Sequence, residues 1–166
     1  MASEKNPLSK FPQEVRSGIQ PSSPVYTRLP DRYAVHGPRP PSKDALLSMG
    51  EGEDRIEIFR GEAEQQKNAP GQVGPVYTLQ PGGTPAVPSG RVFIRFKEGV
   101  PVERRLREIE QAGYEVVQRL DYAPHAAWLR ARSGEIADAL TRIPALEQIA
   151  DVENVEPQML MQRANR

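Results

Sequence analysis

The sequence predicts an α+β fold. We expect a ferredoxin-like β-α-β-β-α-β domain, with a single antiparallel sheet and two helices on one face, preceded by a largely disordered arm. Thirteen of the 17 prolines and ten of the 13 glycines lie in residues 1–90, whereas apolar residues recur at strand or helix spacing after that point. The connections between these periodic segments are short, which allows neighbouring strands to pair.

The domain boundaries follow from the same shift in composition. We expect residues 1–89 to form a disordered N-terminal arm, residues 90–158 the folded domain, and residues 159–166 a flexible C-terminal tail. Proline fixes φ and removes a backbone donor, and a Pro/Gly-rich segment buries too little apolar surface to offset its conformational entropy. Residues 43–67 are the one part of the arm that could order, as a short helix.

The tetrapeptide Pro-Val-Tyr-Thr occurs twice in the expected arm, at Pro24–Thr27 and at Pro75–Thr78. One interpretation is a repeated docking motif, because an extended segment can present aromatic and β-branched side chains to a partner. The other interpretation is a chance repeat in a proline-rich tract, since short motifs recur without function. The sequence leaves both open.

The folded domain opens with a strand and a helix. Alternation over Arg91–Lys97 predicts a half-buried strand, whose buried face carries Val92, Ile94 and Phe96. Gly99 and Pro101 then interrupt the strand, and proline is tolerated at a helix start. Apolar residues at helical spacing predict the first helix, which Gly113 ends: Val102, Leu106, Ile109 and Ala112.

Two further strands, a helix and a last strand complete the domain. Tyr114–Leu120 and Ala126–Arg132 are joined by a turn, and Trp128 shares one side of the later strand with Arg130. Ser133 is the expected N-cap of a second helix, which carries an apolar stripe and meets Pro144. Val152–Glu156 forms the last strand. The predicted core is Val92, Ile94, Phe96, Leu106, Ile109, Val117, Leu129, Leu140 and Ile143.

Four segments of this half resemble the inhibitory prodomain of subtilisin-like serine proteases, the peptidase inhibitor I9 and fervidolysin-type group. They are Arg91–Gly99, Ala112–Val117, Ala139–Pro144 and Val152–Pro157. The last is the most specific, because its two valines spaced by two residues and its following acidic residue are similar to the closing pattern of that family. The resemblance covers residues 90–158.

The resemblance implies a protein that inhibits a separately encoded subtilisin-like protease in trans, assists its folding, or both. In that family the open sheet face packs on two enzyme helices, and the C-terminal tail occupies the substrate cleft. The candidate protease-binding residues are therefore Asp121, Glu153, Glu156, Met159, Leu160, Met161, Gln162, Arg163 and Ala164. The carboxylates would cap enzyme helices. The alternative for the carboxylates is that they are ordinary solvated charges. The alternative for residues 159–161 is that they complete the core of the domain itself.

Composition argues against several other functions. The 22 basic and 22 acidic residues are balanced, so we expect no nucleic-acid partner, and there is no cysteine for a disulfide or thiolate site. His36 and His125 stand alone, without the partners of a catalytic or metal site, and we expect neither an enzyme nor a cofactor. No segment is apolar enough for a membrane helix or a signal peptide, which predicts a cytoplasmic protein without a membrane partner.

The alternative function is a ferredoxin-like interaction or regulatory module that homodimerises through its open sheet face. An RNA-binding variant of such a module would need exposed aromatic residues with basic neighbours on that face. Phe93 with Arg95, and Trp128 with Arg130, partly meet this requirement. The neutral net charge and the absence of the glycine pattern typical of RNA-recognition motifs count against it.

Overall fold

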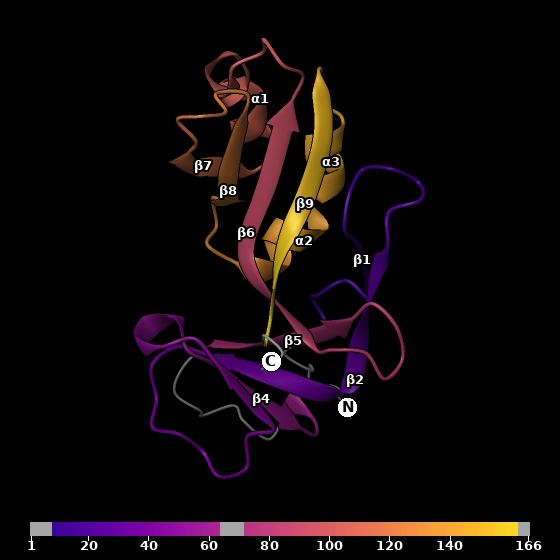
Figure 1. The fold of residues 1–166 in the computed structure, drawn as a ribbon, viewed down its shortest axis with the longest axis vertical. Helices are drawn as coiled ribbons and strands as arrows, with labels where there is room; N and C mark the ends of the chain where they lie inside the picture. Colours follow the sequence, from indigo (N-terminus) through magenta and orange to yellow (C-terminus); the bar gives the residue numbers. More distant parts are fainter. Residues whose placement is uncertain (1–7, 64–71, 163–166) are drawn as a thin grey trace, which may run out of the picture. The chain divides into compact units, whose positions relative to one another are not determined.

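The computed structural model describes residues 8–63 and 72–162, and the chain divides into two compact units (Figure 1). Unit 1 comprises Met1–Gln13, Thr27–Val87 and Met159–Arg166, and unit 2 comprises Glu14–Tyr26 and Pro88–Gln158. Each unit is therefore assembled from segments that are far apart in the sequence.

The described residues form nine strands and several short helices. The strands are β1 (Glu14–Arg16), β2 (Val25–His36), β3 (Leu47–Met49), β4 (Ile56–Arg60), β5 (Gln72–Thr78), β6 (Ala86–Phe96), β7 (Tyr114–Arg119), β8 (Ala126–Ala131) and β9 (Val152–Met161). The helices are the 3-10 helices η1 (Gly52–Asp54) and η3 (Val102–Arg105) and the α-helices α1 (Leu106–Gln111), α2 (Ile136–Thr141) and α3 (Ile143–Glu147).

The predicted fold class is wrong. Strand pairing runs in the order β3-β4-β2-β5-β6-β8-β7, with β1 beside β2 and β9 beside β6, which makes a nine-stranded sheet rather than a simple two-helix ferredoxin-like domain. The segment expected to be a disordered arm contributes five strands and the start of β6. Of residues 43–67, the described part contains the three-residue helix η1 between two strands rather than a longer helix.

Unit 1 is built on antiparallel pairs. β4 pairs with both β2 and β3, and β2 also pairs with β5. One face of these strands packs into an apolar cluster of Ala34, Ile56, Ile58, Val76 and Val87, with Leu29, Leu47, Met49 and Leu160 against it. Period-2 alternation in β4 places Ile56 and Ile58 in this cluster and turns Glu57 to the opposite side.

Prolines are accommodated in these strands because of where they lie. The register of β2 against β5 shifts between Arg28 and Tyr33, and Pro30 lies within this irregularity. A bulge leaves residues unpaired, so the missing N–H of proline removes no ladder hydrogen bond there. The composition that predicted disorder is therefore compatible with a sheet.

The two copies of Pro-Val-Tyr-Thr lie in or beside neighbouring strands. Their final residues, Thr27 of β2 and Thr78 of β5, are directly opposite each other in the antiparallel register. Both copies carry the valine, tyrosine and threonine that favour a strand. The repeat thus has a structural interpretation that neither sequence-based explanation included.

A buried carboxylate lies on the face of unit 1 opposite the apolar cluster. Glu57 is 1 % exposed, and its Oε2 accepts a hydrogen bond of 3.1 Å from the Ser42 N–H. Its oxygens lie 3.4 Å from Nε of Arg39 and 3.8 Å from Nη2 of Arg55. The Arg39 guanidinium also lies 5.3 Å from the ring centroid of Phe59, so these contacts tie the segment before β3 to strand β4.

His36 makes the stability of unit 1 dependent on pH. Its Nε2 is buried against Gly74, and burial lowers the pKa of the imidazole to about 4, from 6.5 in an exposed histidine. As the pH falls below 6.5, His36 becomes protonated in the unfolded chain but stays neutral in the folded chain. The free energy of unfolding therefore decreases as the pH falls, until the pKa of the folded state is reached.

We expect unit 1 to lose about 2 kcal/mol of stability between pH 7 and pH 5 through His36. Amide hydrogen exchange in β2 and β4 at the two pH values, corrected for the intrinsic pH dependence of exchange, measures this loss within unit 1. His36→Gln should remove most of the difference between the two pH values, because glutamine does not titrate. An equal loss in the variant and the parent chain would show that other groups control the acid response.

Unit 2 contains β6, β8 and β7 side by side, with β9 on the other side of β6. In Figure 1 the helices lie behind these strands, on one face only. That face contains buried side chains from strands and helices, among them Val92, Ile94, Phe96, Leu129, Ile109, Leu140 and Leu146. The buried Tyr114 hydroxyl donates a hydrogen bond of 2.6 Å to the Ala139 carbonyl, which joins β7 to α2.

The individual elements after residue 90 lie close to their predicted positions. The strands predicted over 114–120, 126–132 and 152–156 correspond to β7, β8 and the first half of β9. Two predicted core residues are only half-buried: Leu106 at the start of α1, and Val117, which falls where the β7–β8 register shifts between Val116 and Gln118. The shift disrupts the inward–outward alternation on which the prediction of Val117 rests.

The described helices include none with the length and apolar character needed to cross a membrane.

Candidate functional site

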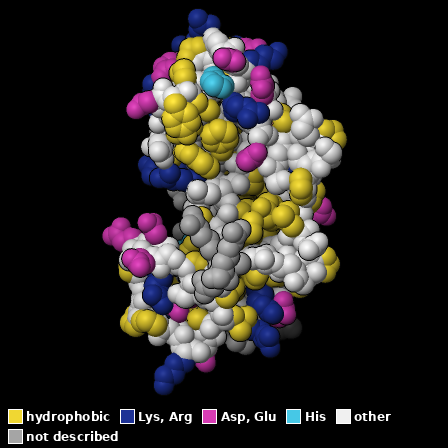
Figure 2. Space-filling model, in the orientation of Figure 1, with side chains coloured by type: hydrophobic (Ala, Val, Ile, Leu, Met, Phe, Trp, Pro, Cys, Tyr) yellow, Lys and Arg dark blue, Asp and Glu magenta, His cyan; other side chains and the backbone are white. Residues whose placement is uncertain are grey.

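The uncovered face of the unit 2 sheet carries the most distinctive group of side chains. We call it the aromatic face and define it by Arg91, Phe93, Arg95, Glu115, Gln118, Trp128, Arg130 and Glu153. Figure 2 shows hydrophobic side chains gathered over this part of the sheet, with basic and acidic side chains beside them. Among the described residues, the helices of this unit cover the opposite side of the same strands.

An aromatic pair lies at the centre of this face. Phe93 of β6 and Trp128 of β8 are directly opposite each other in the antiparallel register. Their ring centroids are 5.2 Å apart and their planes are tilted by 60°, a favourable aromatic geometry. Both side chains are half-buried, so part of each ring is exposed and available for contact. Cross-strand register therefore produces a preformed apolar contact surface.

Charged and polar pairs surround the two rings. Nε of Arg130 donates to Glu115 Oε1 at 2.6 Å, and Nη1 of Arg91 donates to Gln118 Oε1 at 3.1 Å. Nε of Arg95 lies 3.9 Å from Glu153 Oε2, and both of these side chains are largely exposed. Exposed pairs of this kind contribute little to folding stability. Their effect here is to hold charged groups in position around the aromatic pair.

The three predicted carboxylates lie in different places. Glu153 belongs to the aromatic face through Arg95. Glu156, also exposed, accepts a hydrogen bond of 2.6 Å from Asn154 Nδ2 and lies near Tyr26. Burial raises the pKa of the Tyr26 phenol, and the negative charge of Glu156 raises it further. Asp121 lies exposed in the turn between β7 and β8.

The predicted tail residues are only partly a tail. Met159, Leu160 and Met161 form the end of β9 rather than a flexible extension. Leu160 packs against the apolar cluster of unit 1, whereas Met161 is 41 % exposed. Gln162 follows the strand and is exposed, and Arg163 and Ala164 lie outside the described residues.

The two histidines lie in different units. His36 is buried against Gly74, and the His125 carbonyl accepts a hydrogen bond from the Phe96 N–H beside the β7–β8 turn. Within residues 8–63 and 72–162, no three His, Cys, Asp or Glu side chains come together as a metal site.

Phe93 and Trp128 are not among the site residues that the sequence predicts. The signal was present, because alternation over Arg91–Lys97 and over Ala126–Arg132 places each aromatic residue on the polar side of its strand. What alternation does not give is the register that sets the two rings opposite each other.

Comparisons of the chain with protein-family models, with curated proteins and with solved structures give no match.

Proposed function

We propose that unit 2 is a protein-binding module that covers a surface of its partner with the aromatic face. The observation that carries this proposal is the half-buried Phe93–Trp128 pair on an uncovered sheet, surrounded by three arginines. Aromatic residues and arginine supply most of the energy in protein interfaces, where a central apolar contact is surrounded by polar residues. A preformed sheet also loses little backbone entropy on binding.

The partner we propose is a subtilisin-like serine protease, which the protein inhibits in trans or helps to fold. Support comes from the segments that resemble the prodomains of that family, two of which include residues of the aromatic face: Arg91–Gly99 and Val152–Pro157. Glu153 lies at the edge of that face, where its carboxylate can accept hydrogen bonds from the N-terminus of a partner helix.

The end of β9 favours docking by the sheet over insertion of a tail. For residues 159–161 to occupy a substrate cleft, they must leave a strand, and Leu160 must leave an apolar cluster. That exposure of apolar surface opposes binding. We therefore propose that the aromatic face supplies most of the affinity.

Residual protease activity tests this function. The intact chain is titrated into a panel of purified subtilisin-like proteases, and hydrolysis of a peptide substrate is followed. We expect at least one enzyme to lose activity in a saturable manner. If no enzyme is inhibited and none refolds faster with the chain present, the protease is the wrong partner.

A second candidate function is self-association through the same face. The face carries both signs of charge, with Arg91, Arg95 and Arg130 close to Glu115 and Glu153, so a second copy can offer complementary charges. Sedimentation of the purified chain across a concentration series distinguishes the two functions. A dimer that Trp128→Ala dissociates, together with unaffected proteases, would favour the homodimer.

A further inference from the structure

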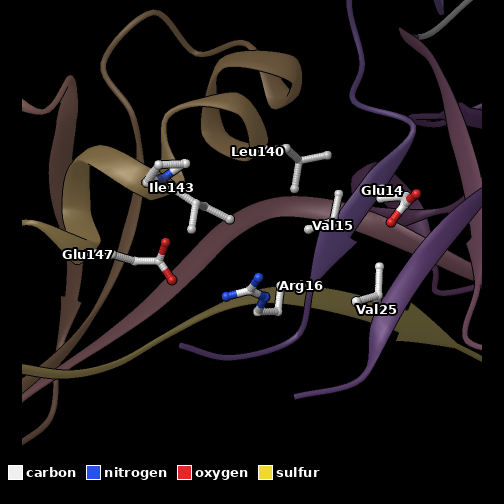
Figure 3. A pocket seen from close by; sticks show the side chains of 8 residues that line it. Glu14, Val15, Arg16, Val25, Leu140, Ile143 and Glu147 are labelled. Atoms are coloured by element: carbon white, nitrogen blue, oxygen red, sulfur yellow. The ribbon is translucent and has the colours of Figure 1, made fainter. Parts of the chain in front are cut away.

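A pocket of about 290 Å³ lies within unit 2, away from the aromatic face. Its walls come from β1, from the start of β2 and from helices α2 and α3 (Figure 3). The lining residues are Glu14, Val15, Arg16, Val25, Leu140, Ile143, Pro144 and Glu147. This volume is at the lower end of the range for small-molecule sites, so it suits a ligand with one compact apolar group.

The interior of the pocket is aliphatic. Figure 3 shows Val15 and Val25 on the strand side, facing Leu140 and Ile143 from the helices. Val15, Leu140 and Ile143 are buried, so these walls are held in place by the packing of the unit. A branched aliphatic group would complete the contacts of these side chains, which is the main source of affinity in an apolar pocket.

Two opposite charges lie at one end of this aliphatic surface. Figure 3 shows the Arg16 guanidinium, from β1, and the Glu147 carboxylate, from α3, at the same end of the pocket and on opposite walls. Among the described residues, neither group has a hydrogen bond or an ion pair within 4.0 Å. Burial raises the pKa of Glu147, and Arg16 partly offsets this effect. Glu147 is therefore partly desolvated, whereas Arg16 is exposed, and both groups are available to a ligand.

We propose that this pocket binds a free aliphatic α-amino acid of the size of leucine. The side chain occupies the space between Val15, Val25 and the helices, the α-ammonium group contacts the Glu147 carboxylate, and the α-carboxylate contacts the Arg16 guanidinium. An amino acid has an apolar group and two opposite charges attached to the same carbon atom, which matches the arrangement of the walls. A fatty acid or an aliphatic amine would satisfy only one of the two charges.

Calorimetric titration of the full chain with four probes tests the proposal. The probes are L-leucine, N-acetyl-L-leucine, which has no ammonium group, and the single-charge analogues isovalerate and isoamylamine. We expect saturable binding of leucine, with each of the other three at least about 10-fold weaker, because a hydrogen bond to a charged group contributes strongly. Failure of leucine to saturate at about 10 mM, or equal binding of leucine and N-acetyl-leucine, would overturn the proposal.

Variants assign each charge to its contact. Glu147→Gln should weaken leucine about 10-fold and leave isovalerate unchanged, whereas Arg16→Gln should weaken leucine and isovalerate but not isoamylamine. Glu110→Gln is the matched control: it removes an exposed carboxylate of α1 that does not line the pocket, and it should leave leucine binding unchanged. If Glu147→Gln and Glu110→Gln weaken leucine equally, Glu147 does not contact the ammonium group.

Discussion

Replacing both Phe93 and Trp128 with alanine is expected to weaken binding of the proposed protein partner by at least about 100-fold. The two rings form the centre of the aromatic face, and truncation of central aromatic residues in interfaces costs 2 kcal/mol or more for each hot-spot residue. The rings are only half-buried in the free protein, so their removal should affect the stability of unit 2 much less than it affects binding. Inhibition titrations give the affinity, and thermal melting gives the stability.

The matched control is an exposed apolar side chain outside this face. Leu79 of unit 1 is 47 % exposed, and Leu79→Ala should leave both affinity and melting unchanged. Partner affinity that survives the double replacement within threefold would show that another surface makes the contact. A double variant that fails to fold is replaced by Trp128→Phe, for which we expect a smaller but measurable loss of affinity.

Replacing Glu57 with alanine is expected to destabilise unit 1 by about 3–5 kcal/mol. The carboxylate is 1 % exposed and lies between two guanidinium groups, so its removal leaves Arg39 and Arg55 without their counter-charge. Removing one partner of a buried ion pair costs about 3–5 kcal/mol of folding stability, because the remaining charge is left buried without a counter-charge. The net contribution of the intact pair is smaller than this cost. The Ser42 N–H also loses its acceptor.

Amide hydrogen exchange in β2 and β4 measures this effect within unit 1 itself. A global unfolding curve is less suitable, because a chain with two compact units need not unfold in one step. Glu53→Ala is the control, since Glu53 is exposed in η1 and its replacement should leave the exchange rates unchanged. Similar protection in the Glu57→Ala and Glu53→Ala variants would mean that the buried ion pairs do not hold the strands together.

The elements of unit 2 could be predicted because their signals are local. Alternation over Arg91–Lys97, helical spacing before Gly113 and the break at Pro144 each depend on a few neighbouring residues, and β6, α1 and α2 lie close to these positions. Of the two predicted core residues that are only half-buried, Val117 lies at a register shift that involves two strands. Register is a property of pairs, and no single segment encodes it.

Unit 1 could not be predicted because its strands depend on partners distant in the sequence. β4, with its buried Ile56 and Ile58, has only five residues, too few for local alternation to predict a strand, although it pairs with both β2 and β3. Proline content suggested disorder, yet Pro30 lies at an irregularity and Pro75 lies opposite Tyr33 on β2. The proline content of a segment, averaged over its length, favours disorder. A sheet requires only that each proline lie where its missing N–H would not have made a ladder hydrogen bond.

Only part of the candidate site could be predicted, because its arrangement also depends on contacts between strands. Glu153 was identified and does lie on the aromatic face, but through a contact with Arg95 that the sequence does not specify. Met159–Met161 was assigned to a tail because the sequence shows no continuation of the strand beyond Pro157, a residue that β9 nevertheless includes. Proline removes one donor from a strand and does not have to end it.

The central claim is that the aromatic face binds the partner protein, and Trp128 allows a direct measurement because it is the only tryptophan in the chain. Incorporation of 5-fluorotryptophan gives a single fluorine resonance from this face, which is followed as unlabelled partner is added. We predict that the resonance shifts or broadens in proportion to complex formation, as measured independently by inhibition. A resonance that stays unchanged while the protease is fully inhibited would contradict docking through this face.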